Sequence, residues 1–277
     1  MSFTVVARKD FADARRSRAL WFLTALFVLF AGVMAYAYAT LDIPITVGTE
    51  TYEGSTLGLV FFLVAPASLF ISITAVVIAN KAIAGERESG QMKLALGLPN
   101  SRFDFVLGKV VGRAAVLLAA VVIGFVVSLG VVVATLGELA LVPFATFLGV
   151  TVVYALVYVS LVVALSSMFA SAGQATSAAV GLWFLLEVLW DVVPLGLYWV
   201  VNGFSLDGQP PQWIGGIAGL SPSTAYNTAL TAVMPNVSPI AQGDAFYLQP
   251  WFGLVVLAFW LVVPLALGAW RFNSVDL

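Results

Sequence analysis

Residues 139–186 read LALVPFATFLGVTVVYALVYVSLVVALSSMFASAGQATSAAVGLWFLL, and this stretch decides the fold. It contains no charged residue over 48 positions. About 20 mostly apolar residues are enough for a helix to cross a bilayer, so there is room here for two spans. Small and polar residues cluster at 171–174, where we expect the chain to turn. The stretch therefore predicts one span over residues 142–170 and another that starts near Gln174.

The rest of the chain has the same apolar character. Of its 277 residues, 61% are hydrophobic and 9% are charged, whereas a soluble domain usually carries about 25% charged residues. The first apolar run is longer than the core of about 7–15 residues found in a cleavable signal peptide. We therefore predict an all-α polytopic membrane protein with six transmembrane helices. They cover residues 19–41, 57–79, 110–136, 142–170, 174–191 and 251–270.

The 12 Lys and Arg residues predict the orientation of these spans. All of them precede the first span, lie between or just inside the second and third spans, or follow the last span. The segments 42–56, 137–141 and 191–250 contain none. Basic residues concentrate in cytoplasmic loops of membrane proteins. The pattern thus predicts a multi-pass protein of the cytoplasmic (plasma) membrane with both N- and C-termini in the cytoplasm.

The segment ahead of the first span, residues 1–18, is patterned as an amphipathic helix. Phe3, Ala7 and Phe11 fall on one helical face, and charged residues that include Asp10 occupy much of the rest. Such a pattern predicts a helix that lies in the cytoplasmic membrane interface. The alternative is a basic flank that only sets the topology. In the outer loop, residues 192–250, the apolar stretch 192–201 is too short to cross again, so we expect a re-entrant or outer-surface helix there.

The cytoplasmic loop of residues 80–109 contains AGERESGQMKLALGLPNSRFDF at 84–105. The helix of the second span is predicted to continue to Ser89 and to end at Gly90, because glycine favours the position just after a helix. A short apolar helix is then predicted up to Pro99. Such a helix on the cytoplasmic side would be a contact surface for a partner or for the lipid interface.

Two short patterns mark the start of the third span. Ser101 followed by Asp104 has the form of a capping box, in which the serine caps the first turn of a helix. Gly108 and Gly112 have the spacing of a small-xxx-small contact, which lets another helix approach closely.

Three segments together resemble the permease subunit of type-2 ABC transporters, the ABC-2 superfamily. They are ARKDFADARRSRALW at 7–21, NKAIAGERESGQMKLALGLPNSRFDFVLGK at 80–109 and LSPSTAY at 220–226. The resemblance is to the small stand-alone form, which includes the nitrous-oxide reductase maturation permeases. It implies that the loop is a coupling region that docks into an ATPase subunit. The implied coupling residues are Glu86, Arg87, Glu88, Ser89, Gly90, Met92, Leu94, Leu96 and Pro99.

The resemblance also implies the assembly. The chain has no phosphate-binding GxxxxGK[ST] motif, no cysteine and no histidine, which removes most intramembrane enzyme chemistry. We expect no catalytic residue, metal or cofactor on this chain, so ATP and magnesium would belong to a separate ATPase present in two copies. The second permease would be an identical chain or a paralogue, with the transport path between the two. The expected surroundings are the lipid bilayer, and no nucleic acid.

Candidate pathway residues are scarce in so apolar a chain. Glu187 and Asp191 are the only acids near a membrane core, and ionisable groups at depth often mark a pathway. Tyr154 and Tyr158 could line the same path, although such residues are more often packing or interhelical hydrogen-bond contacts. Two other functions stay open from the residues alone: a non-transporting membrane scaffold or assembly subunit, and an ion-coupled secondary transporter.

Overall fold

The structure, a computed structural model, describes residues 3–16, 18–47, 50–92, 101–137, 139–234, 237 and 243–273. Within them lie six helical stretches that are long and apolar enough to cross a membrane, which confirms the predicted all-α polytopic fold. The six are Trp21–Thr40, Thr56–Glu88, Arg102–Leu136, Leu141–Met168, Ala172–Leu189 and Phe252–Asn273.

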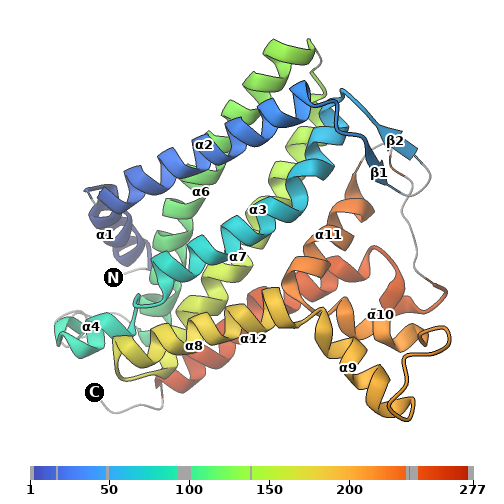
Figure 1. The fold of residues 1–277 in the computed structure, drawn as a ribbon. Helices are drawn as coiled ribbons and strands as arrows, with labels where there is room; N and C mark the ends of the chain where they lie inside the picture. Colours follow the sequence, from blue (N-terminus) through green and yellow to red (C-terminus); the bar gives the residue numbers. More distant parts are fainter. Residues whose placement is uncertain are drawn as a thin grey trace.

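In the described part of the chain, the elements form a series of helices with one small hairpin (Figure 1). In order they are α1 (Phe3–Arg16), α2 (Arg18–Thr40), β1 (Ile45–Val47), β2 (Glu50–Tyr52), α3 (Thr56–Ala79), α4 (Ala84–Glu88), α6 (Arg102–Leu136), α7 (Leu141–Met168), α8 (Ala172–Phe184), the π-helix η1 (Leu185–Leu189), α9 (Val192–Val201), α10 (Gln212–Ala218), α11 (Pro222–Val233), the 3-10 helix η2 (Phe246–Leu248) and α12 (Phe252–Asn273).

Serine residues cap the starts of several helices. Ser101 accepts a hydrogen bond from the backbone N–H of Asp104 at 3.0 Å, which confirms it as the N-cap of α6, and it donates to the Asp104 carboxylate at 2.6 Å. Ser55, Ser171 and Ser221 accept equivalent backbone bonds at the starts of α3, α8 and α11. These bonds satisfy backbone donors that a helix leaves unpaired in its first turn.

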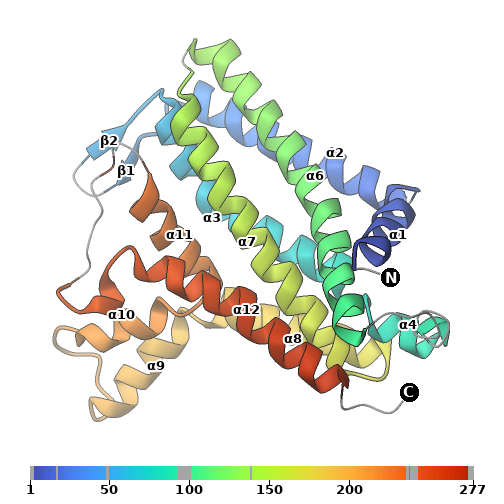
Figure 2. The same cartoon turned by 180° about the vertical axis from the view of Figure 1, so that it is seen from behind.

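The core centres on α7, which packs against α3, α6, α11 and α12 (Figure 2). Of the six candidate spans it is the most buried, at 67%, whereas the span formed by α8 and η1 is only 17% buried. A span with so little burial in the single chain leaves most of its surface to lipid or to another chain.

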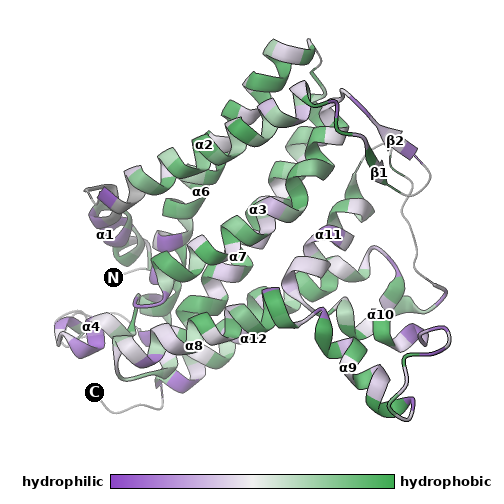
Figure 3. Ribbon diagram, viewed as in Figure 1, coloured by the Kyte–Doolittle hydropathy of each residue, from purple (hydrophilic) through white to green (hydrophobic). Residues whose placement is uncertain are grey.

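At one end of the molecule, which we call the polar end, α1, α4 and the last turn of α12 lie near one another, and the hairpin, α9 and α10 lie at the opposite end (Figure 1). Coloured by hydropathy, both ends carry hydrophilic segments: α1, α4 and the start of α6 at the polar end, and the hairpin and the turns around α9 and α10 at the other (Figure 3). The long helices between the two ends are mostly hydrophobic (Figure 3).

Several local features differ from the sequence-based expectation. The helix predicted to run unbroken to Ser89 is interrupted by a turn over residues 80–83, after which α4 forms. The segment 42–56 contains the antiparallel pair β1 and β2, with Thr46 opposite Thr51, which apolar periodicity does not reveal. The predicted helix at 192–201 is present as α9, but the outer loop also contains α10, α11 and η2, which were not predicted from the sequence.

Two glycines of α6 offer a matched test of helix packing. A Cβ added at Gly124 would lie 2.9 Å from the backbone oxygen of Phe27 in α2, whereas one added at Gly130 meets nothing within 4 Å. We expect Gly124→Ala to destabilise the protein by about 1–3 kcal/mol, because backbone atoms of α2 must move. Gly130→Ala should leave stability unchanged or raised, since alanine favours helices. Thermal unfolding of the two purified variants measures the difference, and equal melting temperatures would contradict the close α2–α6 contact.

Candidate functional site

Four charged side chains form a buried cluster at the polar end of the molecule. Lys109 of α6 donates to Asp10 of α1 at 2.8 Å and to Glu86 of α4 at 2.5 Å. One turn further along α6, Nε of Arg113 lies 2.9 Å from the second carboxylate oxygen of Asp10. Arg113 also donates to the backbone oxygen of Ile78 at the end of α3, at 3.1 Å. The cluster thus connects α1, α3, α4 and α6.

The cluster is balanced in charge and largely shielded from solvent. Asp10 and Lys109 are each 5% exposed, and two carboxylates face two cations. Burying an ion is unfavourable unless an opposite charge and hydrogen bonds compensate for the lost water. Asp10 is therefore held inward, and the sequence-based assignment of Asp10 to a polar outer face is wrong. The helical periodicity of α1 could not show that its partner lies far away, on α6.

Glycines of α6 allow α1 to approach closely enough for these contacts. A Cβ at Gly108 would lie 2.6 Å from Cβ of Val6, and one at Gly112 would lie 2.7 Å from Cβ of Asp10. The predicted small-residue contact is confirmed, and its partner is α1. The first helix is thus docked on the bundle, which argues against its being only a basic flank.

The short helix α4 is anchored to two more spans. The backbone N–H groups of Ile83 and Ala84 both donate to the hydroxyl of Ser166 in α7, at 3.2 Å each. The carboxylate of Glu88 accepts from the backbone N–H of Ala172, the first residue of α8, at 2.7 Å. An acid at a helix N-terminus also interacts favourably with the helix dipole. Movement of α4 would therefore pull on α7 and α8 as well as on α6.

The residues predicted to couple to the ATPase differ in whether their side chains contact the rest of the chain or are exposed. Glu86 and Glu88 contact other elements of the same chain, and Met92 is 1% exposed and part of the core, so it is not the exposed contact that the sequence suggested. Ser89 and Gly90 are exposed, Arg87 is half-buried, and Gly90 ends the turn with φ of 74°. Leu94, Leu96 and Pro99 lie outside the described residues.

Three of the four candidate pathway residues meet inside the bundle. The carboxylate of Glu187 accepts hydrogen bonds from the hydroxyl groups of Tyr154, at 3.1 Å, and of Tyr158. Both tyrosines belong to α7, and Glu187 belongs to the π-helix η1, a rare conformation that often occurs at functional sites. Asp191 lies beyond η1 with an exposed side chain. The contact therefore joins the least buried span to the most buried one.

Further polar residues, which the sequence did not single out, continue this network. The Tyr154 hydroxyl lies 3.2 Å from the backbone oxygen of Ser68, and the indole N–H of Trp183 donates to the Ser72 hydroxyl at 3.0 Å. On the other side, Tyr226 of α11 lies 2.8 Å from Thr151, and its ring centroid is 4.7 Å from that of Tyr154. Single serines and tyrosines in an apolar run do not indicate such a network. Only Tyr226 lies in a segment that carries the family resemblance, LSPSTAY at 220–226.

The fold, the buried charge cluster and the polar network around Glu187 together define a class of protein. It is a polytopic membrane protein whose polar end carries a short helix anchored to several spans. A family model described as ABC-2 family transporter protein matches residues 4–277, so the chain belongs to that family. It is a membrane permease subunit of an ABC transporter, a family in which a separate subunit hydrolyses ATP. This membership decides against a secondary transporter.

Two relatives agree with this membership. The probable ABC transporter permease protein NosY of Pseudomonas aeruginosa is 28% identical over 283 residues, which cover 95% of this chain and 93% of the relative. The protein of the same name from Stutzerimonas stutzeri is 29% identical over 209 residues, covering 72% and 71%.

Proposed function

We propose that α4 and the segment after it receive the movement of a separate ATPase and pass it to the spans. The observation that carries this proposal is the anchoring of α4 to α6 through Glu86, to α7 through Ser166 and to α8 through Glu88. Packed elements transmit a displacement as rigid bodies. In this proposal Glu86, Glu88 and Met92 hold the element in place. The ATPase contact is made by Arg87, Ser89, Gly90, Leu94, Leu96 and Pro99.

The two glutamates of α4 provide the first test. We expect Glu86→Ala combined with Glu88→Ala to reduce the amount of ATPase that co-purifies with the permease by about tenfold, the equivalent of about 1.4 kcal/mol. The reason is that α4 loses its bonds to Lys109 and to Ala172. Glu50→Ala with Glu53→Ala, two exposed glutamates at the opposite end, is the matched control. Wild-type co-purification and ATP hydrolysis in the α4 variant would refute the proposal.

The assembly we propose contains two permease chains and two ATPase subunits. ATP and magnesium bind to the ATPase, and the transport path lies between the two permeases, which are identical chains or paralogues. The low burial of the span formed by α8 and η1, 17%, supports a second chain beside it. Within this path we assign a role to Glu187 with Tyr154 and Tyr158, and to Asp191 at its outer end.

We further propose that the polar end faces the cytoplasm across the cytoplasmic membrane. The elements at this end (Figure 1) carry basic residues, as expected for cytoplasmic segments. They are Arg8 and Lys9 in α1, Lys109 and Arg113 in the first turns of α6, and Arg271 in the last turn of α12. The opposite end, with the hairpin, α9 and α10, carries no Lys or Arg among its described residues.

Cysteine labelling tests this orientation, because the natural chain has 0 cysteines. Ser89→Cys and Thr51→Cys place one exposed thiol at each end. In right-side-out vesicles, a membrane-impermeant maleimide should label Thr51→Cys, and it should label Ser89→Cys only after the vesicles are permeabilised. The reverse pattern would show that the polar end lies outside.

A further inference from the structure

An apolar cavity lies beside the first turns of α12, at the end of the molecule opposite α4. Its volume is about 310 Å³, and it is lined by Trp190, Leu220, Phe252, Val255, Val256, Phe259 and Trp260. The lining comes from three parts of the chain: the residue after η1, the connection between α10 and α11, and α12. Val256 at its base is 4% exposed, whereas Val255 and Phe259 on its rim are about half exposed.

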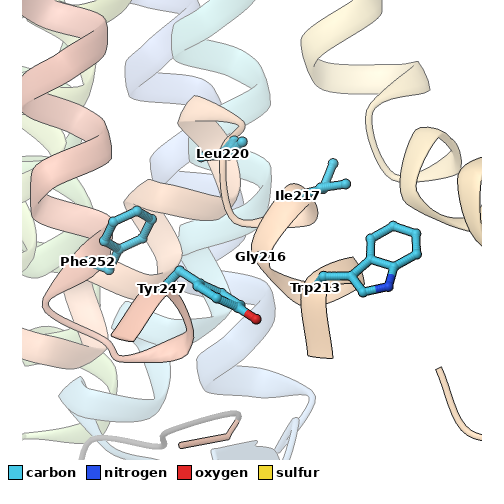
Figure 4. Close-up of a pocket in the computed structure, with 6 residues that line it drawn as sticks. All are labelled: Trp213, Gly216, Ile217, Leu220, Tyr247 and Phe252. Carbon is cyan, nitrogen blue, oxygen red and sulfur yellow. The ribbon is translucent and has the colours of Figure 1, made fainter. Parts of the chain in front are cut away.

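A second cavity of about 250 Å³ adjoins the first and shares Leu220 and Phe252 with it. Its other lining residues are Trp213, Gly216, Ile217 and Tyr247 (Figure 4). The Tyr247 ring lies between Phe252 and Trp213, close to the backbone at Gly216 (Figure 4). A Cβ at Gly216 would lie 2.7 Å from that ring, so the glycine is needed for the wall. The two cavities adjoin at Leu220 and Phe252, and we refer to them together as the aromatic cleft.

The polar side-chain atoms around the first cavity are already bonded to the protein. The indole N–H of Trp190 donates to the backbone oxygen of Ile217 at 3.0 Å, and that of Trp260 donates to the backbone oxygen of Leu220 at 2.8 Å. Ring carbons and aliphatic side chains are left to face the first cavity, whereas the second also has the Trp213 indole N–H and the Tyr247 hydroxyl in its lining (Figure 4). A buried water needs about two to four polar partners, and the side chains around the first cavity do not offer them. If the space were empty, its lining atoms would lack van der Waals partners. A hydrocarbon chain needs no hydrogen bonds and supplies those van der Waals contacts.

The charges near the cleft select among lipids. The chain has no Lys or Arg between Arg113 and Arg271, whereas Asp191 follows Trp190 directly, and Asp244 precedes Tyr247 by three positions. A lipid with a net negative headgroup would meet acids and no cation here. A zwitterionic headgroup, whose ammonium group can approach the acids, is compatible with this surface.

We infer that the cleft binds one acyl chain of a zwitterionic phospholipid in the leaflet at this end of the molecule. The chain lies against Val256, with the rings of Trp190, Phe259 and Trp260 around it, and continues past Leu220 toward Tyr247. The binding site rests on the membrane-spanning fold and does not depend on which end is cytoplasmic or on how the ATPase docks.

Photo-crosslinking tests the inference on the complete transporter in vesicles. The probe is phosphatidylcholine with a diazirine in one acyl chain, and the labelled peptides are identified by mass spectrometry. We expect labels concentrated on the stretches around Leu220 and Phe252–Trp260. Val255→Trp, which fills the rim, should reduce this labelling several-fold. Val262→Trp is the control, because Val262 is exposed on the same face of α12 two turns away and does not line the cleft.

Three results would overturn the inference. One is labelling spread evenly over the exposed faces of α2 and α12, which would indicate only surrounding lipid. Another is equal or stronger labelling by phosphatidylglycerol with the same chains, since the charge argument would then be wrong. The third is a change in the number of permease chains per complex in Val255→Trp with lipid labelling unchanged, which would place a second chain in the cleft.

Discussion

Replacing Lys109 with methionine is expected to destabilise the protein by about 3–5 kcal/mol, because Asp10 and Glu86 then lose their shared cation inside the protein. Whole domains are stable by only about 5–15 kcal/mol, so much of the protein should fail to accumulate. Arg113 cannot replace the lost charge, since it reaches only Asp10 among the two carboxylates. Thermal unfolding of the purified permease–ATPase complex, together with its yield from membranes, measures the effect.

Matched variants separate charge from shape in this prediction. Lys9→Met removes an exposed lysine of α1 and should have an effect within about 0.5 kcal/mol. Adding Glu86→Gln to Lys109→Met removes the carboxylate that is left without a cation, while Asp10 keeps Arg113, and should recover part of the loss. If Lys109→Met unfolds at the wild-type temperature, or the double variant is less stable than the single one, the cluster does not hold α1 and α4 in place.

The spans could be read from the sequence because the bilayer imposes a simple requirement. A helix that crosses hydrocarbon must be apolar over its whole length, so charge-free runs such as 139–186 identify α7 and α8, and the polar break at 171–174 marks their boundary. Capping follows from neighbouring residues, so the bond from Ser101 to Asp104 was also predictable. In both cases the deciding information lies within a few turns of one helix.

The buried cluster could not be read in the same way. Periodicity places a charged residue such as Asp10 on a solvent face by default, and only its partner on α6 reverses that assignment. The two are separated by 99 positions, and nothing local to either residue encodes the pairing. Lys109 did carry a weak signal, since it lies between Gly108 and Gly112, the positions that bring α1 close.

The polar network around Glu187 shows a similar limit. The sequence supplies the acid and the two tyrosines, but their meeting depends on how α7 and η1 pack. The π-helix η1, in which backbone bonds join residues five positions apart, is a rare conformation that apolar periodicity does not predict. The same packing separates Asp191, which is exposed, from the other three candidates.

Glu187→Gln is expected to retain the fold but to reduce ATP hydrolysis by the assembled complex by about tenfold. The glutamine side-chain oxygen can still accept bonds from Tyr154 and Tyr158. The negative charge of the side chain is lost. Hydrogen bonds to charged groups contribute about 1.5–3 kcal/mol, and about 1.4 kcal/mol corresponds to a tenfold change in an equilibrium constant. We expect this effect because η1 connects the exposed span to α7, so a weaker bond alters the movement of α8 during each ATP cycle.

Two further variants decide what the carboxylate does. Glu187→Leu removes the acceptor of the Tyr158 hydroxyl, whereas Tyr154 keeps the backbone oxygen of Ser68, and should lower stability by about 1–3 kcal/mol. Glu53→Gln, in an exposed position after the hairpin, should change neither stability nor ATP hydrolysis. A thiol at Ser177, exposed on α8, reports the movement through its labelling with and without a non-hydrolysable ATP analogue. If Glu187→Gln is as unstable as Glu187→Leu, the carboxylate serves packing alone. If it preserves both hydrolysis and the ATP-dependent change in labelling, Glu187 has no part in the pathway.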